Sequence, residues 1–255
     1  MNKIYSKILE KGNRVLNIYV TAGFPKLDSL PKLLGILNTL EVDLVEIGIP
    51  YSDPLADGPT IQNSSEKALK NGMTLHLLFN QLNSIKNTNK IPLILMGYYN
   101  QLLQFGVESF LQNAAESGIS GLIIPDLPME IYENKYKRIF EKYNMGISFL
   151  ITPNTSEERI IKADELSNTF VYAVSQTSIT GKTSQINKNQ YEYFEKLKNF
   201  KFKNPYLIGF GIHDKYTFDE ACNYSQGAII GSAFIRVLES DESEKNITHF
   251  INGIK

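Results

Sequence analysis

Short apolar segments alternate along the chain with longer segments in which apolar residues recur every three or four positions. The short segments are nearly continuous in valine, isoleucine and leucine, which is typical of parallel strands buried on both faces. Eight such segments are found, at residues 15–21, 42–49, 91–97, 119–125, 146–152, 169–175, 206–211 and 228–231.

The longer segments predict amphipathic helices. One of them places Leu30, Leu33, Leu34 and Leu37 on a single helical face. Eight strands that alternate with helices predict an α/β fold, a (β/α)8 TIM barrel with extra short helices, forming one domain over residues 1–255. An open doubly wound sheet built from the same elements is the alternative, because periodicity alone does not separate the two.

The composition of the chain argues against several classes of protein. The chain is 42% hydrophobic and has 26 Lys+Arg against 27 Asp+Glu, a net charge of −1. This balance argues against disorder and against a nucleic-acid-binding protein, which would be strongly basic. No apolar run approaches the roughly 20 residues that cross a bilayer. The single cysteine, Cys222, forms no internal disulfide, and no zinc-like spacing occurs. We expect a reducing compartment, the cytoplasm or an organelle interior such as a plastid, and no metal.

Residues 46–60 carry the strongest chemical signal. Reactive groups of a barrel lie at the carboxyl ends of its strands, and this segment follows the second expected strand. Its three prolines and two glycines restrict the loop, and it contributes Glu46, Asp53 and Asp57. Glu46 has apolar neighbours, which would raise its pKa towards neutrality and suit it to acid–base catalysis. The structural alternatives are that Glu46 pairs with a buried base and that the two aspartates only stabilise turns.

Two further loops are candidates for substrate contacts. Residues 209–212 end the seventh expected strand, and residues 231–233 end the eighth and begin a helix. Barrels often bind phosphate between these two loops, where glycine lets the backbone approach an anion. Residues 175–185 form a long polar segment after the sixth strand, which predicts either a lid that excludes water or a plain flexible connection.

Residues 42–62 closely resemble the signature of the tryptophan synthase α subunit family. The resemblance continues along nearly the whole chain, in the segments at residues 19–25 (YVTAGFP), 96–100 (MGYYN), 124–128 (IPDLP), 208–212 (IGFGI) and 230–233 (IGSA). It implies a lyase that cleaves indole-3-glycerol phosphate into indole and glyceraldehyde 3-phosphate in tryptophan biosynthesis. It also implies that this chain holds no cofactor.

The resemblance also implies roles for individual residues. Glu46 matches the catalytic glutamate and Asp57 the carboxylate that stabilises the indole N–H. The expected substrate contacts are Tyr19, Tyr172, Thr180, Gly181, Phe210, Gly211, Gly231 and Ser232. Ser178 stands where the family's mobile loop usually has glycine, which we expect to stiffen that loop.

A partner subunit follows from the same resemblance. Asp53, Pro54 and Pro128 match the family's contact region with a β subunit, which carries pyridoxal phosphate and receives the indole. An α2β2 heterotetramer is therefore expected. Two alternatives stay open, a free-standing lyase that releases indole and an inactive subunit that only activates its partner. The intact Glu46 and Asp57 argue against the second.

Overall fold

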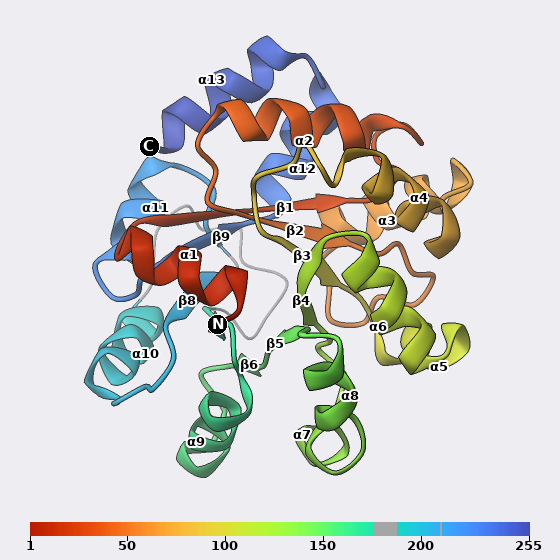
Figure 1. Ribbon diagram of the computed structural model, residues 1–255. Coiled ribbons are helices and arrows are strands. Elements are labelled where there is room, and N and C mark those ends of the chain that lie inside the picture. The colour runs from red at the N-terminus through yellow and green to blue at the C-terminus, as the bar shows by residue number, and fades with distance from the viewer. Residues whose placement is uncertain (176–187, 210) are drawn as a thin grey trace.

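A sheet of nine parallel strands lies at the centre of the computed structural model, which describes residues 1–175, 188–209 and 211–255 (Figure 1). The strands are β1 (Val15–Thr21), β2 (Leu44–Gly48), β3 (Leu93–Met96), β4 (Ile119–Ile123), β5 (Gly146–Ser148), β6 (Leu150–Ile151), β7 (Val171–Val174), β8 (Tyr206–Gly209) and β9 (Gly227–Ile230). They are neighbours in the order β5-β4-β3-β2-β1-β9-β8-β7-β6. All eight predicted strands are therefore present.

The sheet closes into a barrel through its fifth predicted strand. That strand is split at Phe149 into β5 and β6, which pair with β4 and β7 at the two ends of the strand order. The Phe149 carbonyl also accepts a hydrogen bond of 2.9 Å from the Tyr172 amide. Because an open sheet would leave its end strands apart, the barrel prediction is confirmed and the doubly wound alternative is wrong.

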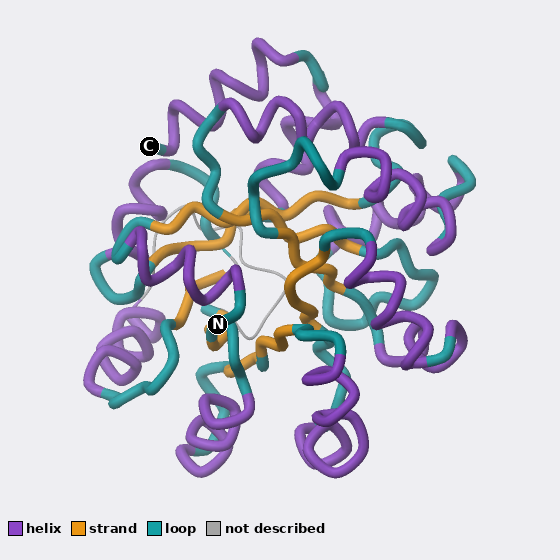
Figure 2. Tube along the Cα trace, viewed as in Figure 1, coloured by secondary structure: helices purple, strands orange, loops and turns teal. Residues whose placement is uncertain are grey.

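Helices surround the strands on the outside of the barrel (Figure 2). They are α1 (Lys3–Lys11), α2 (Ser29–Thr39), α3 (Pro59–Lys70), α4 (Leu75–Ile85), α5 (Tyr99–Phe105), α6 (Val107–Glu116), α7 (Met129–Ile131), the π-helix η1 (Tyr132–Tyr136), α8 (Lys137–Lys142), α9 (Glu157–Leu166), α10 (Lys188–Asn199), α11 (Lys215–Cys222), α12 (Ser232–Ser240) and α13 (Glu244–Ile254). The predicted face of α2 is buried, with Leu34 and Leu37 fully inaccessible. Among the described residues, no helix is both long and apolar enough to cross a membrane.

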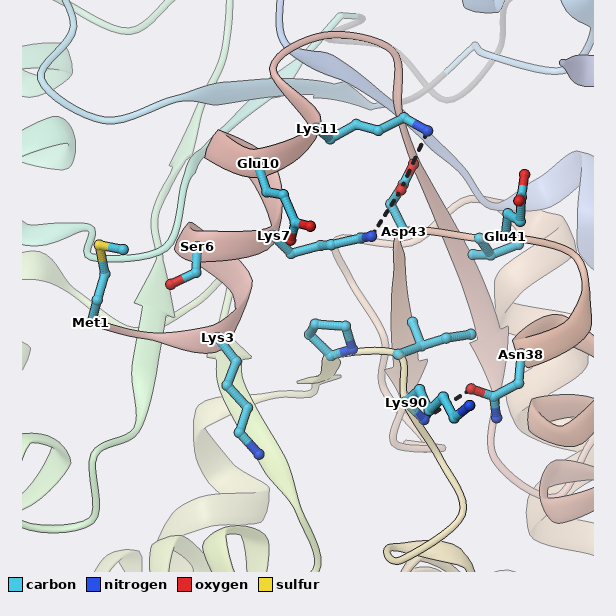
Figure 3. A pocket seen from close by; sticks show the side chains of 13 residues that line it. Met1, Lys3, Ser6, Lys7, Glu10, Lys11, Asn38, Glu41, Asp43 and Lys90 are labelled. Atoms are coloured by element: carbon cyan, nitrogen blue, oxygen red, sulfur yellow. Dashed lines mark hydrogen bonds and ion pairs between the residues drawn. The ribbon is translucent and has the colours of Figure 1, made fainter.

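The N-terminal end of the barrel is closed by α1. The buried Ile4 side chain packs against Gly121 on β4. Lys7 and Lys11 each form an ion pair of 3.6 Å with Asp43, which is buried just before β2 (Figure 3). A hollow of about 660 Å³ lies beside these groups, and none of the predicted site residues lines it. The predicted site residues lie on the strands and at their carboxyl ends, away from this hollow.

Candidate active site

The register of β1 and β2 places two predicted site residues side by side. Tyr19 on β1 pairs with Glu46 on β2. Asn17 precedes Tyr19 by two positions and therefore lies on the same face of the strand. Both strands are buried throughout, so the polar side chains on this face are removed from water.

Glu46 is fully buried and has one hydrogen-bond partner. The Asn17 amide Nδ2 donates to Glu46 Oε1 over 2.6 Å, whereas Oε2 has no partner among the described residues. Burial raises the pKa of Glu46 to about 8, and the hydrogen bond from Asn17 opposes this rise. In the described part of the chain Glu46 makes no ion pair with a base, so the structural alternative finds no support there. A carboxyl with this pKa can both donate and accept a proton near neutrality.

Asp57 is buried in the loop that follows β2, and a tyrosine holds it there. The Tyr98 hydroxyl donates to Asp57 Oδ2 over 2.9 Å and accepts a hydrogen bond of 3.0 Å from the Ala56 amide. The ring of Tyr51 stacks on that of Tyr98, with centroids 5.1 Å apart. Burial raises the pKa of Asp57 to about 6, against the opposing effect of Tyr98. The Asp57 side chain thus binds a tyrosine from the segment after another strand.

Tyr98 contacts a predicted site residue, and our reading of the sequence gave it no role. It lies two residues after the end of β3 and is buried beside the loop that carries Asp57. The available signal was an aromatic residue with a hydroxyl group at the carboxyl end of a strand, which is where barrels place reactive groups. Its partner Asp57 lies in the loop after a different strand, so the sequence around Tyr98 could not predict this contact.

The charges of the two carboxyl groups raise the pKa of the same two buried tyrosines, Tyr19 and Tyr172. Burial raises the pKa of Tyr19 and Tyr172 above their ordinary values, and the negative charges of Asp57 and Glu46 raise both further. Tyr172 lies on β7, which is remote from β2 in the strand order. The barrel therefore brings Tyr19 and Tyr172 close enough to Glu46 and Asp57 for the charges of both carboxyl groups to act on their hydroxyl groups.

Two strand-end glycines make room for these tyrosines. A methyl group added at Gly48 would overlap the Tyr19 hydroxyl, and one added at Gly209 would overlap the Tyr172 hydroxyl. Any larger residue at either position would push a tyrosine ring out of place, because packed interiors leave little room for an added group. The two glycines thus leave the space that the Tyr19 and Tyr172 hydroxyl groups occupy inside the barrel.

The predicted phosphate residues lie at the same end of the barrel. Gly209 pairs with Ile229, so Gly211 and Gly231, each two residues further along, follow neighbouring strands. Gly231 and Ser232 begin α12, whose first turn has no side-chain cap. The amides of an uncapped first turn attract an anion, assisted by the helix dipole. This arrangement suits a phosphate group.

The remaining predicted residues either lie at the surface, fully or partly exposed, or fall outside the residues that the structure describes. Asp53 and Pro128 are exposed in the loops after β2 and β4, and Pro54 is half-buried. Leu55, next to Pro54, has 87% of its surface exposed. Thr180, Gly181, Ser178 and Phe210 lie outside the described residues, as does nearly all of the predicted lid.

Fold and site together fit one class of protein, the barrel enzymes that carry buried carboxyl groups at the carboxyl ends of their strands. Residues 5–252 match the sequence model of a family described as Tryptophan synthase alpha chain. The chain belongs to this family. The family resemblance, the enzyme class and the cleavage of indole-3-glycerol phosphate in tryptophan biosynthesis, all expected from the sequence, are thereby confirmed.

Relatives in several organisms support this membership over the full length of the chain. The tryptophan synthase alpha chain of Flavobacterium johnsoniae is 52% identical over 255 residues and covers 100% of both chains. That of Karelsulcia muelleri is 49% identical, covering 100% of this chain and 99% of the relative. The crystal structure of the tryptophan synthase A-subunit from Pyrococcus furiosus has a TM-score of 0.86 at 31% identity, covering 94% of this chain and 97% of that one.

Proposed function

We propose that Glu46 and Asp57 divide the acid–base work of indole-3-glycerol phosphate cleavage. The observation that carries this proposal is the pair of buried carboxyl groups, one hydrogen-bonded by an amide and the other by a tyrosine hydroxyl. Their different surroundings give them different proton affinities, with a pKa of about 8 for Glu46 and about 6 for Asp57. Near neutrality the first is mostly protonated and the second mostly ionised, which separates acid from base.

In the proposed reaction Glu46 moves protons at the bond that breaks. Its neutral form protonates indole C3, and Asp57 stabilises the positive charge that develops at the ring N–H. The Glu46 carboxylate then takes the proton of the side-chain hydroxyl as the carbon–carbon bond breaks. The electron pair of the broken carbon–carbon bond returns to the ring, which gives indole. The side chain leaves as glyceraldehyde 3-phosphate. Glu46 ends protonated again, so the cycle consumes no proton and requires no cofactor in this chain.

The rest of the substrate is held, in this proposal, by two further groups of residues. The phosphate binds at Gly211, Gly231 and Ser232, where the uncapped first turn of α12 supports anion binding. Gly181 also belongs to the proposed phosphate site. The indole ring and its side chain contact the residues Tyr19, Tyr172, Thr180 and Phe210. Tyr19 and Tyr172 are buried beside both carboxyl groups, whereas Thr180, Gly181 and Phe210 enter from the family resemblance alone.

A β subunit is the proposed partner of this chain. The family resemblance and the description of the Pyrococcus furiosus relative as a subunit of tryptophan synthase support it. We place the contact at Asp53, Pro54 and Pro128, in an α2β2 heterotetramer whose β subunit holds pyridoxal phosphate. The exposed Leu55 supplies an apolar group at the same loop. Residues 1–255 would act as one domain in the cytoplasm or another reducing compartment.

The test of the catalytic assignment is turnover of indole-3-glycerol phosphate by the Glu46→Gln variant. Glutamine keeps the size of the side chain and can accept the Asn17 hydrogen bond, but it transfers no proton. We expect indole release to fall at least about 100-fold. Glu10→Gln makes the same chemical change at an exposed carboxyl on α1, at the closed end of the barrel, and should leave turnover unchanged. Near-normal turnover by Glu46→Gln would refute the assignment.

The partner is tested separately by gel filtration and a coupled assay with a β subunit. Complex formation and faster cleavage are expected. Their absence, with cleavage by the chain alone intact, would favour a free-standing lyase.

A further inference from the structure

Asn17 is a fully buried polar residue to which the proposed reaction gives no task. It lies in the middle of β1, between the apolar residues Leu16 and Ile18, and its side chain faces the barrel interior. An amide buried in this way costs free energy unless it finds a hydrogen-bond partner. Its partner among the described residues is Glu46 Oε1, which it approaches to 2.6 Å.

We propose that Asn17 is a positioning residue that determines which oxygen of Glu46 carries the proton during catalysis. This inference rests on the proposed role of Glu46 as the acid and base of the cleavage. The amide Nδ2 can only donate, so Oε1 must accept from it in both protonation states. The protonated oxygen of a carboxylic acid donates its hydrogen and accepts poorly. The proton therefore resides on Oε2, which has no partner among the described residues.

The strand register explains from which end of the barrel the Asn17 amide reaches Glu46. Asn17 pairs with Leu44, whereas Tyr19 pairs with Glu46, so Asn17 lies two residues nearer to the end that α1 closes. Two residues of a strand span roughly 6–7 Å. The amide thus approaches the carboxyl group from the closed end. Oε2 is the oxygen that this contact leaves without a hydrogen-bond partner among the described residues.

A neutral donor suits a group that must both give and take a proton. A lysine or arginine at this position would hold Glu46 permanently as a carboxylate. Within the described part of the chain, the titratable groups that act on or near Glu46 are Asp57 and the hydroxyl groups of Tyr19 and Tyr172, and none of them is a cation. The amide therefore orients the carboxyl group without fixing its charge.

The orientation of the amide is set by its partner. Rotating it by half a turn would place Asn17 Oδ1 against Glu46 Oε1, bringing two acceptors together at hydrogen-bond distance. Such a contact is repulsive whenever Glu46 is ionised. In this orientation Asn17 Oδ1 has no hydrogen-bond partner among the described residues, so the bond from Nδ2 to Glu46 is the only one that this side chain forms there.

The test replaces Asn17 with leucine, which has a similar volume and no donor. We expect kcat to fall about 10- to 100-fold, because the acid is no longer held in place, while KM changes less than about threefold. The hydrogen bond from Asn17 lowers the pKa of Glu46, so its loss should raise this pKa. In a plot of kcat against pH, the limb that reports the ionisation of Glu46 should therefore move up by about one pH unit. A residue that only supported the fold would not move that limb.

Three further variants make the result decisive. Ile18→Val trims a buried residue on the other face of β1 and should lower the melting temperature without moving the pH limb. Asn17→Ser, whose side chain is too short to reach Oε1, should repeat the effect on the pH limb if Asn17→Leu does not fold. In a Glu46→Gln background, Asn17→Leu should lower kcat less than about twofold further, because no proton remains to be placed.

The outcomes separate this inference from the proposed function. Near-normal turnover by Glu46→Gln would overturn both. An inactive Glu46→Gln variant, together with an Asn17→Leu or Asn17→Ser variant that keeps kcat within twofold and the same pH limb, would overturn only the role of Asn17. A loss of kcat that is equally large in the Glu46→Gln background would also overturn it, because the effect would then be independent of the proton.

Discussion

Replacing Glu46 by glutamine should make the folded chain more stable at alkaline pH, although it removes the proposed catalyst. The carboxyl group is fully buried, and burial is the main reason for its high pKa. Ionising it inside the barrel therefore costs free energy that ionisation in the unfolded chain does not. Glutamine has nearly the same shape, accepts the same hydrogen bond from Asn17 and never ionises.

The size and the pH range of the effect follow from the shift in pKa. The pKa of Glu46 rises from its ordinary value of 4.5 to about 8 on folding. At about 1.4 kcal/mol per pKa unit, this corresponds to about 5 kcal/mol. Between these two pH values the folded state holds a proton that the unfolded state has released, so the stability of the native protein falls as pH rises. Below pH 4.5 the penalty is absent, and above pH 8 it is complete.

Urea unfolding of the two proteins between pH 5 and pH 9 measures this difference. The chain has no tryptophan, so far-UV circular dichroism is a suitable signal. Comparing the two proteins at each pH cancels other titrations, including that of Asp57, whose pKa of about 6 is also raised. The Glu46→Gln variant should gain several kcal/mol over the native chain from pH 5 to pH 9. If the difference in unfolding free energy between the two proteins stayed constant to within about 1 kcal/mol over this pH range, ionisation of the buried Glu46 would not destabilise the folded chain, and the reasoning would be wrong.

Two other substitutions test the surroundings of the carboxyl groups. Tyr98→Phe removes the hydroxyl that donates to Asp57, so kcat/KM for cleavage should fall roughly tenfold, as expected for a lost hydrogen bond to a charged group. Steady-state kinetics near neutral pH would measure this, and an unchanged kcat/KM would contradict the role of Tyr98. Gly48→Ala should displace the Tyr19 ring, lowering stability by about 1–3 kcal/mol and raising KM. If urea unfolding gave the Gly48→Ala variant the stability of the native chain, the Tyr19 ring would be able to move aside without cost, which would contradict this prediction.

The elements of the fold were readable because their signals are local. A strand buried on both faces appears as a continuous apolar run, and each of the eight runs became a strand of the barrel. Glu46 stood out for the same reason, as a charged residue within such a run. Asn17 interrupts its own run in the same way, but its task depends on a neighbour in another strand, and so its sequence context did not reveal it.

The sequence alone thus determined the parallel strands, the amphipathic helices and the two carboxyl groups that carry the proposed chemistry. The tertiary structure decided how the ends of the sheet meet and which oxygen of Glu46 has no hydrogen-bond partner among the described residues. It also decided that Tyr98, from the segment after another strand, holds Asp57. The physical reason is that periodicity and burial preference are properties of neighbouring residues along the chain. Closure, register and hydrogen-bond partners join residues far apart in sequence, and only packing the whole barrel brings them together.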